Sequence, residues 1–229
     1  MKVRQITMGS VEQWNDGFAA AHDIDDYYTR SGVLIRAIER TRLACIKRMV
    51  AAEPTDRILE VGCGGGHVLR LFPDSKLTGV DVSGSMLAKA RRNLRGYDVS
   101  FHKGELKDLD LPQAGFDKII CSEVLEHVVD PDSIVLRIAG LLRPGGRAVV
   151  TFPNDHLVNR LKSIIRRTGL CAIPPFRRIS WGGDDYHLHL WPVKGMRELL
   201  SRHLTVLQAR FAPSGLLPIR CCFQCTTKS

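Results

Sequence analysis

Two short stretches of this sequence carry residue types that can bind a ligand and handle a proton. The first is EVGCGGGH at Glu60–His67, which has four glycines in five positions directly after an apolar segment. Glycine is costly to order, so this run predicts a turn whose backbone another group approaches closely. The second is EVLEH at Glu123–His127, in which two carboxylates and an imidazole lie close together. Such groups can accept a proton or bind a divalent cation.

Alternating strands and helices are expected to position both stretches. The pattern predicts strands at 57–61, 76–82, 99–102, 116–122 and 147–152, and helices at 65–72, 83–95 and 130–142. A helix follows at 193–203, and the last two strands, at 205–211 and 219–227, form a closing hairpin. Strands separated by such helices pair in parallel through right-handed crossovers. We therefore expect an α/β fold, a Rossmann-like doubly wound sheet of seven strands that is mixed because its closing strand is antiparallel.

The length of 229 residues suits a single domain. We expect four parts within it: a helical cap at 1–55, a core with the glycine-rich turn at 56–153, an insertion or lid at 154–187, and a helix with a strand hairpin at 188–229. No run of 18 apolar residues predicts a transmembrane helix, and the start MKVRQITMGS does not resemble a secretory signal. The seven cysteines have no framework spacing, which indicates reduced thiols and a cytoplasmic location. Cys222 and Cys225 would face opposite sides of a strand, which favours core thiols over a zinc site.

The net charge of +9 is concentrated in one segment. Residues 160–178 hold six Lys or Arg and no acid, and apolar residues alternate with these cations. A solvated basic face or a lid over the active site accounts for such a segment. Alternatively, the segment binds an anionic partner. The most specific hypothesis of this kind is peripheral contact with an anionic membrane through 160–178.

Asp81 ends the second strand and lies 21 positions after Glu60. Ligands of such sheets bind at the carboxyl ends of the strands, and a carboxylate there can bind both hydroxyls of a ribose. Ser83 is the expected cap of the following helix, which leaves Asp81 available. The glycines follow E-x-G-x-G-x-G, and His67 stands where a nicotinamide fingerprint has its third glycine.

The motifs ILEVGCGGG, LTGVDVS, GEL, FDKIICSEVLEHV and LLRPGG, within about 57–153, resemble those of class I S-adenosylmethionine-dependent methyltransferases. Within that superfamily the chain is most similar to the ubiquinone-biosynthesis-type O-methyltransferases. The resemblance implies S-adenosyl-L-methionine as cofactor and a small-molecule acceptor, phenolic or otherwise hydroxylated and rather apolar. The cofactor-binding residues that it implies are Arg42, Glu60, Gly62, Cys63, Gly64, Gly66, Asp81, Val82, Glu105, Leu106 and Ser122.

Several of these positions have an implied role. Glu60 would face the ammonium group, Asp81 the ribose, Glu105 and Leu106 the adenine edge, and Val82 the adenine ring. Ser122 would lie near the methionine moiety, although the family has a Met at this position. Arg42 would contact the cofactor, and the alternative is a surface charge on a helix.

The candidate catalytic residues are Glu123, His127 and His187, and three readings of them remain open. Glu123, Glu126, His127 and His187 could bind a divalent cation, His127 could act as a general base, or the group could serve only as caps and pocket wall.

Two further functions remain as alternatives. The spacing ExxEH with a distant His also resembles small-RNA 3′-end methyltransferases, so a metal-assisted methyltransferase of an RNA end is one of them. Nucleic acid is not the expected partner, because the chain has no separate RNA-binding module. A catalytically silent fold that binds the cofactor or a partner protein is the other. The sequence does not determine the oligomeric state.

Overall fold

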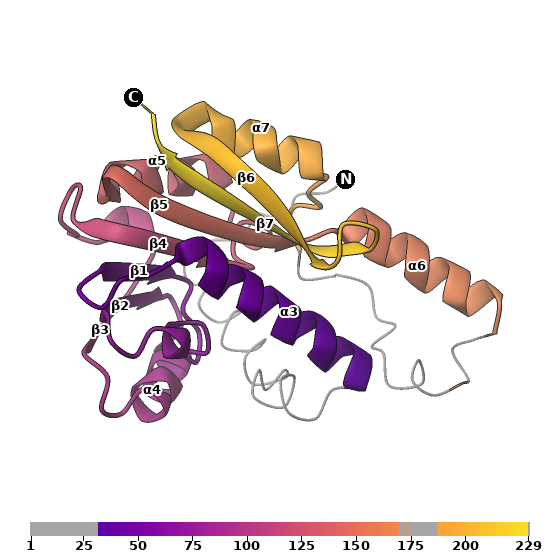
Figure 1. The fold of residues 1–229 in the computed structure, drawn as a ribbon, viewed down its shortest axis with the longest axis horizontal. Coiled ribbons are helices and arrows are strands. Elements are labelled where there is room, and N and C mark those ends of the chain that lie inside the picture. The colour runs from indigo at the N-terminus through magenta and orange to yellow at the C-terminus, as the bar shows by residue number, and fades with distance from the viewer. Residues whose placement is uncertain (1–31, 170–172, 174–186, 229) are drawn as a thin grey trace.

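The computed structural model describes residues 32–169, 173 and 187–228. Its centre is a seven-stranded sheet in the order β3-β2-β1-β4-β5-β7-β6 (Figure 1). The strands are β1 Arg57–Val61, β2 Lys76–Asp81, β3 Val99–Lys103, β4 Phe116–Ser122, β5 Leu142–Pro153, β6 Leu204–Pro213 and β7 Pro218–Thr227. Strands β1 to β5 pair in parallel, and β7 is antiparallel to both β5 and β6. The expected seven-stranded mixed sheet is confirmed, and the last strand of the chain inserts between β5 and β6.

Helices cover both faces of this sheet. They are α3 Val33–Val50, α4 Gly84–Asn93, α5 Pro131–Leu141, α6 Asp155–Arg167 and α7 Val193–His203, with short 3-10 turns at Leu69–Leu71 and Leu106–Asp108. Buried residues of α3 and α4 form one core with one face of the sheet, and those of α5 and α7 form a second core with the other face. Figure 1 shows α3 and α7 on opposite sides of the strands. The sheet therefore has no solvated face in its centre, which suits a parallel arrangement.

The prediction of a helix at 65–72 is wrong. This segment forms turns and only the short 3-10 turn Leu69–Leu71. Gly64 and Gly66 have φ of +48° and +80°, which a right-handed helix excludes, and the Cβ of any other residue at position 66 would lie 2.7 Å from Leu94. The turn geometry thus overrides the apolar periodicity that suggested a helix.

The cysteines of the described residues are free thiols. Cys222 packs in the core beneath α3, whereas Cys225 packs in the core beneath α7, so the two thiols face opposite sides of β7. This confirms their assignment as core thiols. Burial raises the pKa of Cys225 to about 12, so this thiol is protonated and unreactive at neutral pH.

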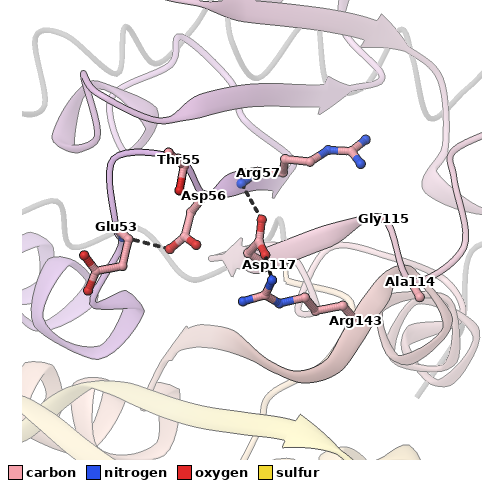
Figure 2. A pocket seen from close by; sticks show the side chains of 8 residues that line it. All are labelled: Glu53, Thr55, Asp56, Arg57, Ala114, Gly115, Asp117 and Arg143. Atoms are coloured by element: carbon pink, nitrogen blue, oxygen red, sulfur yellow. Dashed lines mark hydrogen bonds and ion pairs between the residues drawn. The ribbon is translucent and has the colours of Figure 1, made fainter.

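A polar hollow lies at the amino ends of β1, β4 and β5. Figure 2 shows its lining, which includes Asp117 between Arg57 and Arg143. The Asp117 carboxylate accepts a hydrogen bond from the Arg57 backbone N–H at 2.7 Å and pairs with the Arg143 guanidinium. These bonds tie the starts of three strands together. The two stretches with candidate functional groups follow the opposite, carboxyl ends of β1 and β4, where ligands of such sheets bind.

Helix α6 extends from the end of β5 away from the sheet (Figure 1). It is amphipathic, with Leu157, Leu161, Ile164 and Ile165 at helical spacing and no acid after Asp155. Among the described residues, no helix combines the length and the apolar character needed to cross a membrane. Most of the predicted basic segment after residue 169, and the first 31 residues of the predicted cap, lie outside the described residues.

Candidate active site

The glycine-rich turn after β1 lies directly against the loop that follows β4. Gly62 has a φ of +68°, and a Cβ at this position would lie 2.4 Å from Cγ2 of Val124. Any side chain at Gly62 would therefore displace that loop. The close approach brings Glu60–His67 and Glu123–His127 to one edge of the sheet.

Asp81, at the end of β2, holds this turn in place. Its Oδ2 accepts a hydrogen bond from the Gly64 N–H at 2.7 Å, and its Oδ1 accepts one from the Ser83 N–H at 2.9 Å. The cap of α4 is Ser83, whose Oγ accepts from the Met86 N–H at 3.2 Å, as the sequence predicted. Each carboxylate oxygen can accept a second hydrogen bond. Asp81 is therefore fixed by backbone donors.

Glu60, near the end of β1, is a buried acid. It is 2% exposed, and its Oε2 has no hydrogen-bond partner among the described residues. Burial raises its pKa well above the ordinary value, although the positive charge of Arg42 acts in the opposite direction. A buried acceptor without a donor costs free energy, so this oxygen favours a ligand that brings a donor. An ammonium group fits that requirement.

Arg42, on α3, is 4% exposed, so the reading of this residue as a surface charge is wrong. Its Nε lies 2.7 Å from a carboxylate oxygen of Glu39, and its guanidinium donates to Ser122 Oγ at 2.5 Å. The Ser122 hydroxyl in turn shares a hydrogen bond of 2.9 Å with the Thr151 hydroxyl. This chain of bonds fixes α3 against the carboxyl ends of β4 and β5.

The remaining predicted cofactor residues lie around the same edge. Val82 is half-buried, and Glu105 pairs with Lys107 at 2.9 Å. The Leu106 side chain packs in the core, so any contact of this residue with an adenine edge would use its backbone. Cys63 is 4% exposed, and burial raises the pKa of its thiol, which marks it as a packing residue of the turn.

The structure brings three of the four predicted metal ligands together. Donor atoms of Glu126, His127 and His187 all lie within 4.8 Å of one another. The two imidazole rings are in edge contact, with centroids 4.9 Å apart. Glu126 is 1% exposed, its Oε2 has no hydrogen-bond partner among the described residues, and burial raises its pKa well above the ordinary value. We call these three residues the acceptor-side group.

Glu123 does not belong to the acceptor-side group, which corrects the four-ligand prediction. Its φ is +57°, and 123–128 forms bends and turns where the prediction required a helix. Its Oε1 accepts a hydrogen bond from the Thr151 hydroxyl at 3.0 Å, and its Oε2 lies 3.4 Å from Nε of Arg220. Glu123 is therefore held by an ion pair outside the acceptor-side group.

Backbone bonds hold His187 against the loop after β4. The N–H groups of Leu188 and His189 donate to the Glu126 carbonyl at 2.8 and 3.2 Å. The Trp191 indole N–H donates to the Leu125 carbonyl at 3.3 Å. These long-range contacts place His187 beside His127, although 59 positions separate the two residues in the sequence.

Sequence reasoning missed Asp155, the first residue of α6. It is 2% exposed, and its Oδ2 lies 3.1 Å from Nδ1 of His187. An aspartate at the start of a helix is an ordinary pattern. No signal in the sequence distinguishes this residue from a helix-capping acid.

Comparisons with known proteins agree with this geometry. A family model described as "Methyltransferase domain" matches residues 59–150. The ubiquinone biosynthesis O-methyltransferase of Xylella fastidiosa (strain M23) is 34% identical over 192 residues, which cover 77% of this chain and 78% of that enzyme. The chain belongs to the class I S-adenosylmethionine-dependent methyltransferases.

Other relatives of this methyltransferase align over shorter stretches. Enzymes of the same name from Bordetella avium (strain 197N) and Aromatoleum aromaticum are 35% and 40% identical over 57% and 48% of this chain. The chain spans about half the length of those relatives, 56% and 49%. Among solved structures, the N-methyltransferase NodS of Bradyrhizobium japonicum WM9 in complex with S-adenosyl-L-homocysteine has a TM-score of 0.69. It is 18% identical, over 96% of this chain and 99% of that one. This likeness shows the shared methyltransferase fold.

The buried Glu60 leads to a prediction for this methyltransferase. Because burial raises its pKa well above the ordinary value, we expect Glu60 to bind a proton more readily in the free protein than an exposed glutamate does. An ammonium group beside it would favour the carboxylate, so binding of S-adenosylmethionine should release that proton. Calorimetry in buffers of different ionisation enthalpy measures the release. Glu60→Gln should bind without it, and equal release from both proteins would contradict the prediction.

Proposed function

We propose that this chain transfers the methyl group of S-adenosylmethionine to a hydroxyl of a small, rather apolar acceptor. The observation that carries the proposal is the acceptor-side group, in which His187 joins Glu126 and His127 of the loop after β4. Two imidazoles and a carboxyl there suit removal of a proton from a phenol or a similar hydroxyl. O-methylation is supported by the relatives that are named ubiquinone biosynthesis O-methyltransferases.

The residues present fit the proposed cofactor. The orphaned Oε2 of Glu60 suits its ammonium group, and Gly62, Gly64 and Gly66 leave bare backbone for its methionine part. Asp81 would accept hydrogen bonds from the ribose hydroxyls. When bound, the cofactor supplies a sulfonium that activates the methyl group. The protein must align the acceptor oxygen with that methyl group and remove the proton of the acceptor hydroxyl. Alignment alone supplies much of the rate enhancement.

A substrate panel tests the proposal. The protein is incubated with cofactor labelled in the methyl group and with catechols, quinols and short RNAs. We expect label in the hydroxylated small molecules. Transfer to RNA ends would instead favour the metal-assisted RNA methyltransferase, and cofactor binding without transfer to any acceptor would favour the catalytically silent fold.

We further propose that the acceptor-side group holds a divalent cation. Its donor set of one carboxylate and two imidazoles is typical of transition-metal sites, and its atoms lie close enough together to share one ion. A bound cation lowers the pKa of a hydroxyl that it coordinates. In this reading Glu126, His127 and His187 are ligands, and Glu123 is not.

Removal of metal provides the corresponding prediction. Excess chelator should abolish turnover and leave cofactor affinity unchanged. His127→Ala and His187→Ala should each lower kcat by about 10²-fold or more, as for a lost proton-transfer group. His203→Ala, in a partly exposed pair with Asp132, is the matched control and should retain activity. Full turnover in excess chelator would exclude the cation and leave His127 as the general base.

The basic helix α6 supports a proposal about location. Its cations Arg160, Lys162, Arg166 and Arg167 are near apolar residues, among which Ile164 is 48% exposed. Such a helix can lie in an anionic membrane interface, where each engaged cation contributes about 1 kcal/mol. A lipid-like acceptor would then be reached at the membrane surface.

Co-sedimentation with liposomes tests this location. We expect salt-sensitive binding to vesicles with anionic lipid and none to neutral vesicles. The double variant Arg160→Gln/Arg167→Gln should bind less, whereas Arg95→Gln/Lys194→Gln removes equal charge elsewhere and should bind as the unmodified protein does. Absence of binding at low salt would leave α6 as part of a soluble lid.

A further inference from the structure

Asp155 is a buried acid whose place in the fold is not explained by helix capping. It is the first residue of α6 and is 2% exposed. The capping position is already served by Asn154, whose side chain accepts a hydrogen bond from the Leu157 N–H at 3.3 Å. Burial of a carboxylate costs several kcal/mol unless a partner compensates it. The buried Asp155 carboxylate therefore requires a compensating partner.

That partner is the imidazole of His187. Oδ2 of Asp155 lies 3.1 Å from Nδ1 of His187, and neither atom has another polar partner among the described residues. The distance suits a hydrogen bond, which a rotation of the ring would complete. His187 also makes the edge contact with His127 within the acceptor-side group. One imidazole thus connects the start of α6 to the proposed site of proton removal.

We propose that Asp155 is a positioning residue that accepts a hydrogen bond from Nδ1–H of His187. This bond fixes the tautomer in which Nε2 carries no proton. The hydrogen bond at one ring nitrogen decides the protonation of the other, so Nε2 becomes the atom that binds a cation or receives the acceptor proton. The proposal rests on the proposed function of the acceptor-side group. It adds that α6, through its first residue, sets the orientation of that group.

The chain contains a matched pair for comparison. Asp132, in the first turn of α5, lies 3.1 Å from Nε2 of His203, the same distance as in the Asp155–His187 pair. Its side chain is 41% exposed and also pairs with Arg202. Both aspartates therefore lie in the first turn of a helix and pair with a histidine, but only Asp155 is buried next to the acceptor-side group.

The first measurement needs neither cofactor nor acceptor. Nitrogen-15 NMR of the histidine-labelled chain reads the tautomer of the neutral His187 ring. We expect Nδ1–H in the unmodified protein. Asp155→Ala should change it toward Nε2–H, and Asp155→Asn, which keeps an acceptor oxygen and the side-chain volume, should give an intermediate result. An Nε2–H tautomer in the unmodified protein, or no change in either variant, would overturn the proposal.

Kinetics provide the second measurement. Asp155→Asn should lower kcat by about 10- to 100-fold, the usual effect of losing the partner of a functional histidine, with the KM for S-adenosylmethionine unchanged. Asp132→Asn should leave both constants unchanged. In a His187→Ala background, Asp155→Asn should cause no further loss. A changed tautomer with normal kcat would overturn the positioning role. If no acceptor is methylated at all, the proposed function fails while the tautomer still decides the role of Asp155.

Discussion

Asp81→Ala is expected to lose most of the affinity of this methyltransferase for S-adenosylmethionine. In the proposed complex the carboxylate accepts hydrogen bonds from two ribose hydroxyls, and each charge-assisted bond contributes about 1.5–3 kcal/mol. The substitution also removes the acceptor for the N–H groups of Gly64 and Ser83, which hold the glycine-rich turn. The loss of affinity should therefore exceed about tenfold even if one ribose bond is replaced by water.

Titration calorimetry with cofactor measures this loss. Asp98→Ala, an exposed aspartate before β3, is the control and should bind normally. A melting curve of each variant separates loss of binding from loss of fold. Unchanged affinity in a folded Asp81→Ala protein would remove Asp81 from the cofactor site.

Arg42→Met is expected to destabilise the protein strongly. Arg42 and Glu39 are both buried, and removal of one partner leaves a carboxylate with less compensation in the core. Arg220, whose Nε lies 3.1 Å from the other Glu39 oxygen, keeps the cost near the low end for buried pairs, about 3 kcal/mol. For a chain of this size that corresponds to a Tm about 6–12 °C lower. Arg40→Met, exposed on the same helix, is the control and should have little effect.

The same pair predicts how stability depends on pH. Burial by itself would raise the pKa of Glu39, but Arg220 and Arg42 outweigh it and hold the pKa below the ordinary value of 4.5. The stabilisation from a lowered pKa is present above the unfolded value and is lost as pH falls through the folded value. The difference in unfolding free energy between the unmodified protein and Arg42→Met should therefore be largest at neutral pH and become smaller as pH falls below 4.5. A difference that stays constant with pH would show that the ion pair does not contribute.

Much of this fold could be predicted from the sequence, because the signals for it are local. Strands β1 and β4 begin and end where the apolar runs predict, and Ser83 caps α4 as expected. Glu60, the glycines and Asp81 come from consecutive strands of a parallel sheet, whose carboxyl ends share one edge. Their proximity therefore followed from their order in the chain. The failed helix at 65–72 shows the limit of local patterns, since glycines with positive φ at 64 and 66 replace it by a turn.

The acceptor side was decided by tertiary structure. Glu123 leaves the acceptor-side group because the pairing of Ser122 with Thr151 across β4 and β5 places its carboxylate beside the Thr151 hydroxyl and Arg220. Asp155 is buried beside His187 because 187–191 binds to the loop after β4 through backbone hydrogen bonds. Arg42 is buried because α3 packs across the sheet. In each case the deciding contact joins residues far apart in the chain, and the free energy of such contacts depends on burial and distance, which no local residue pattern encodes.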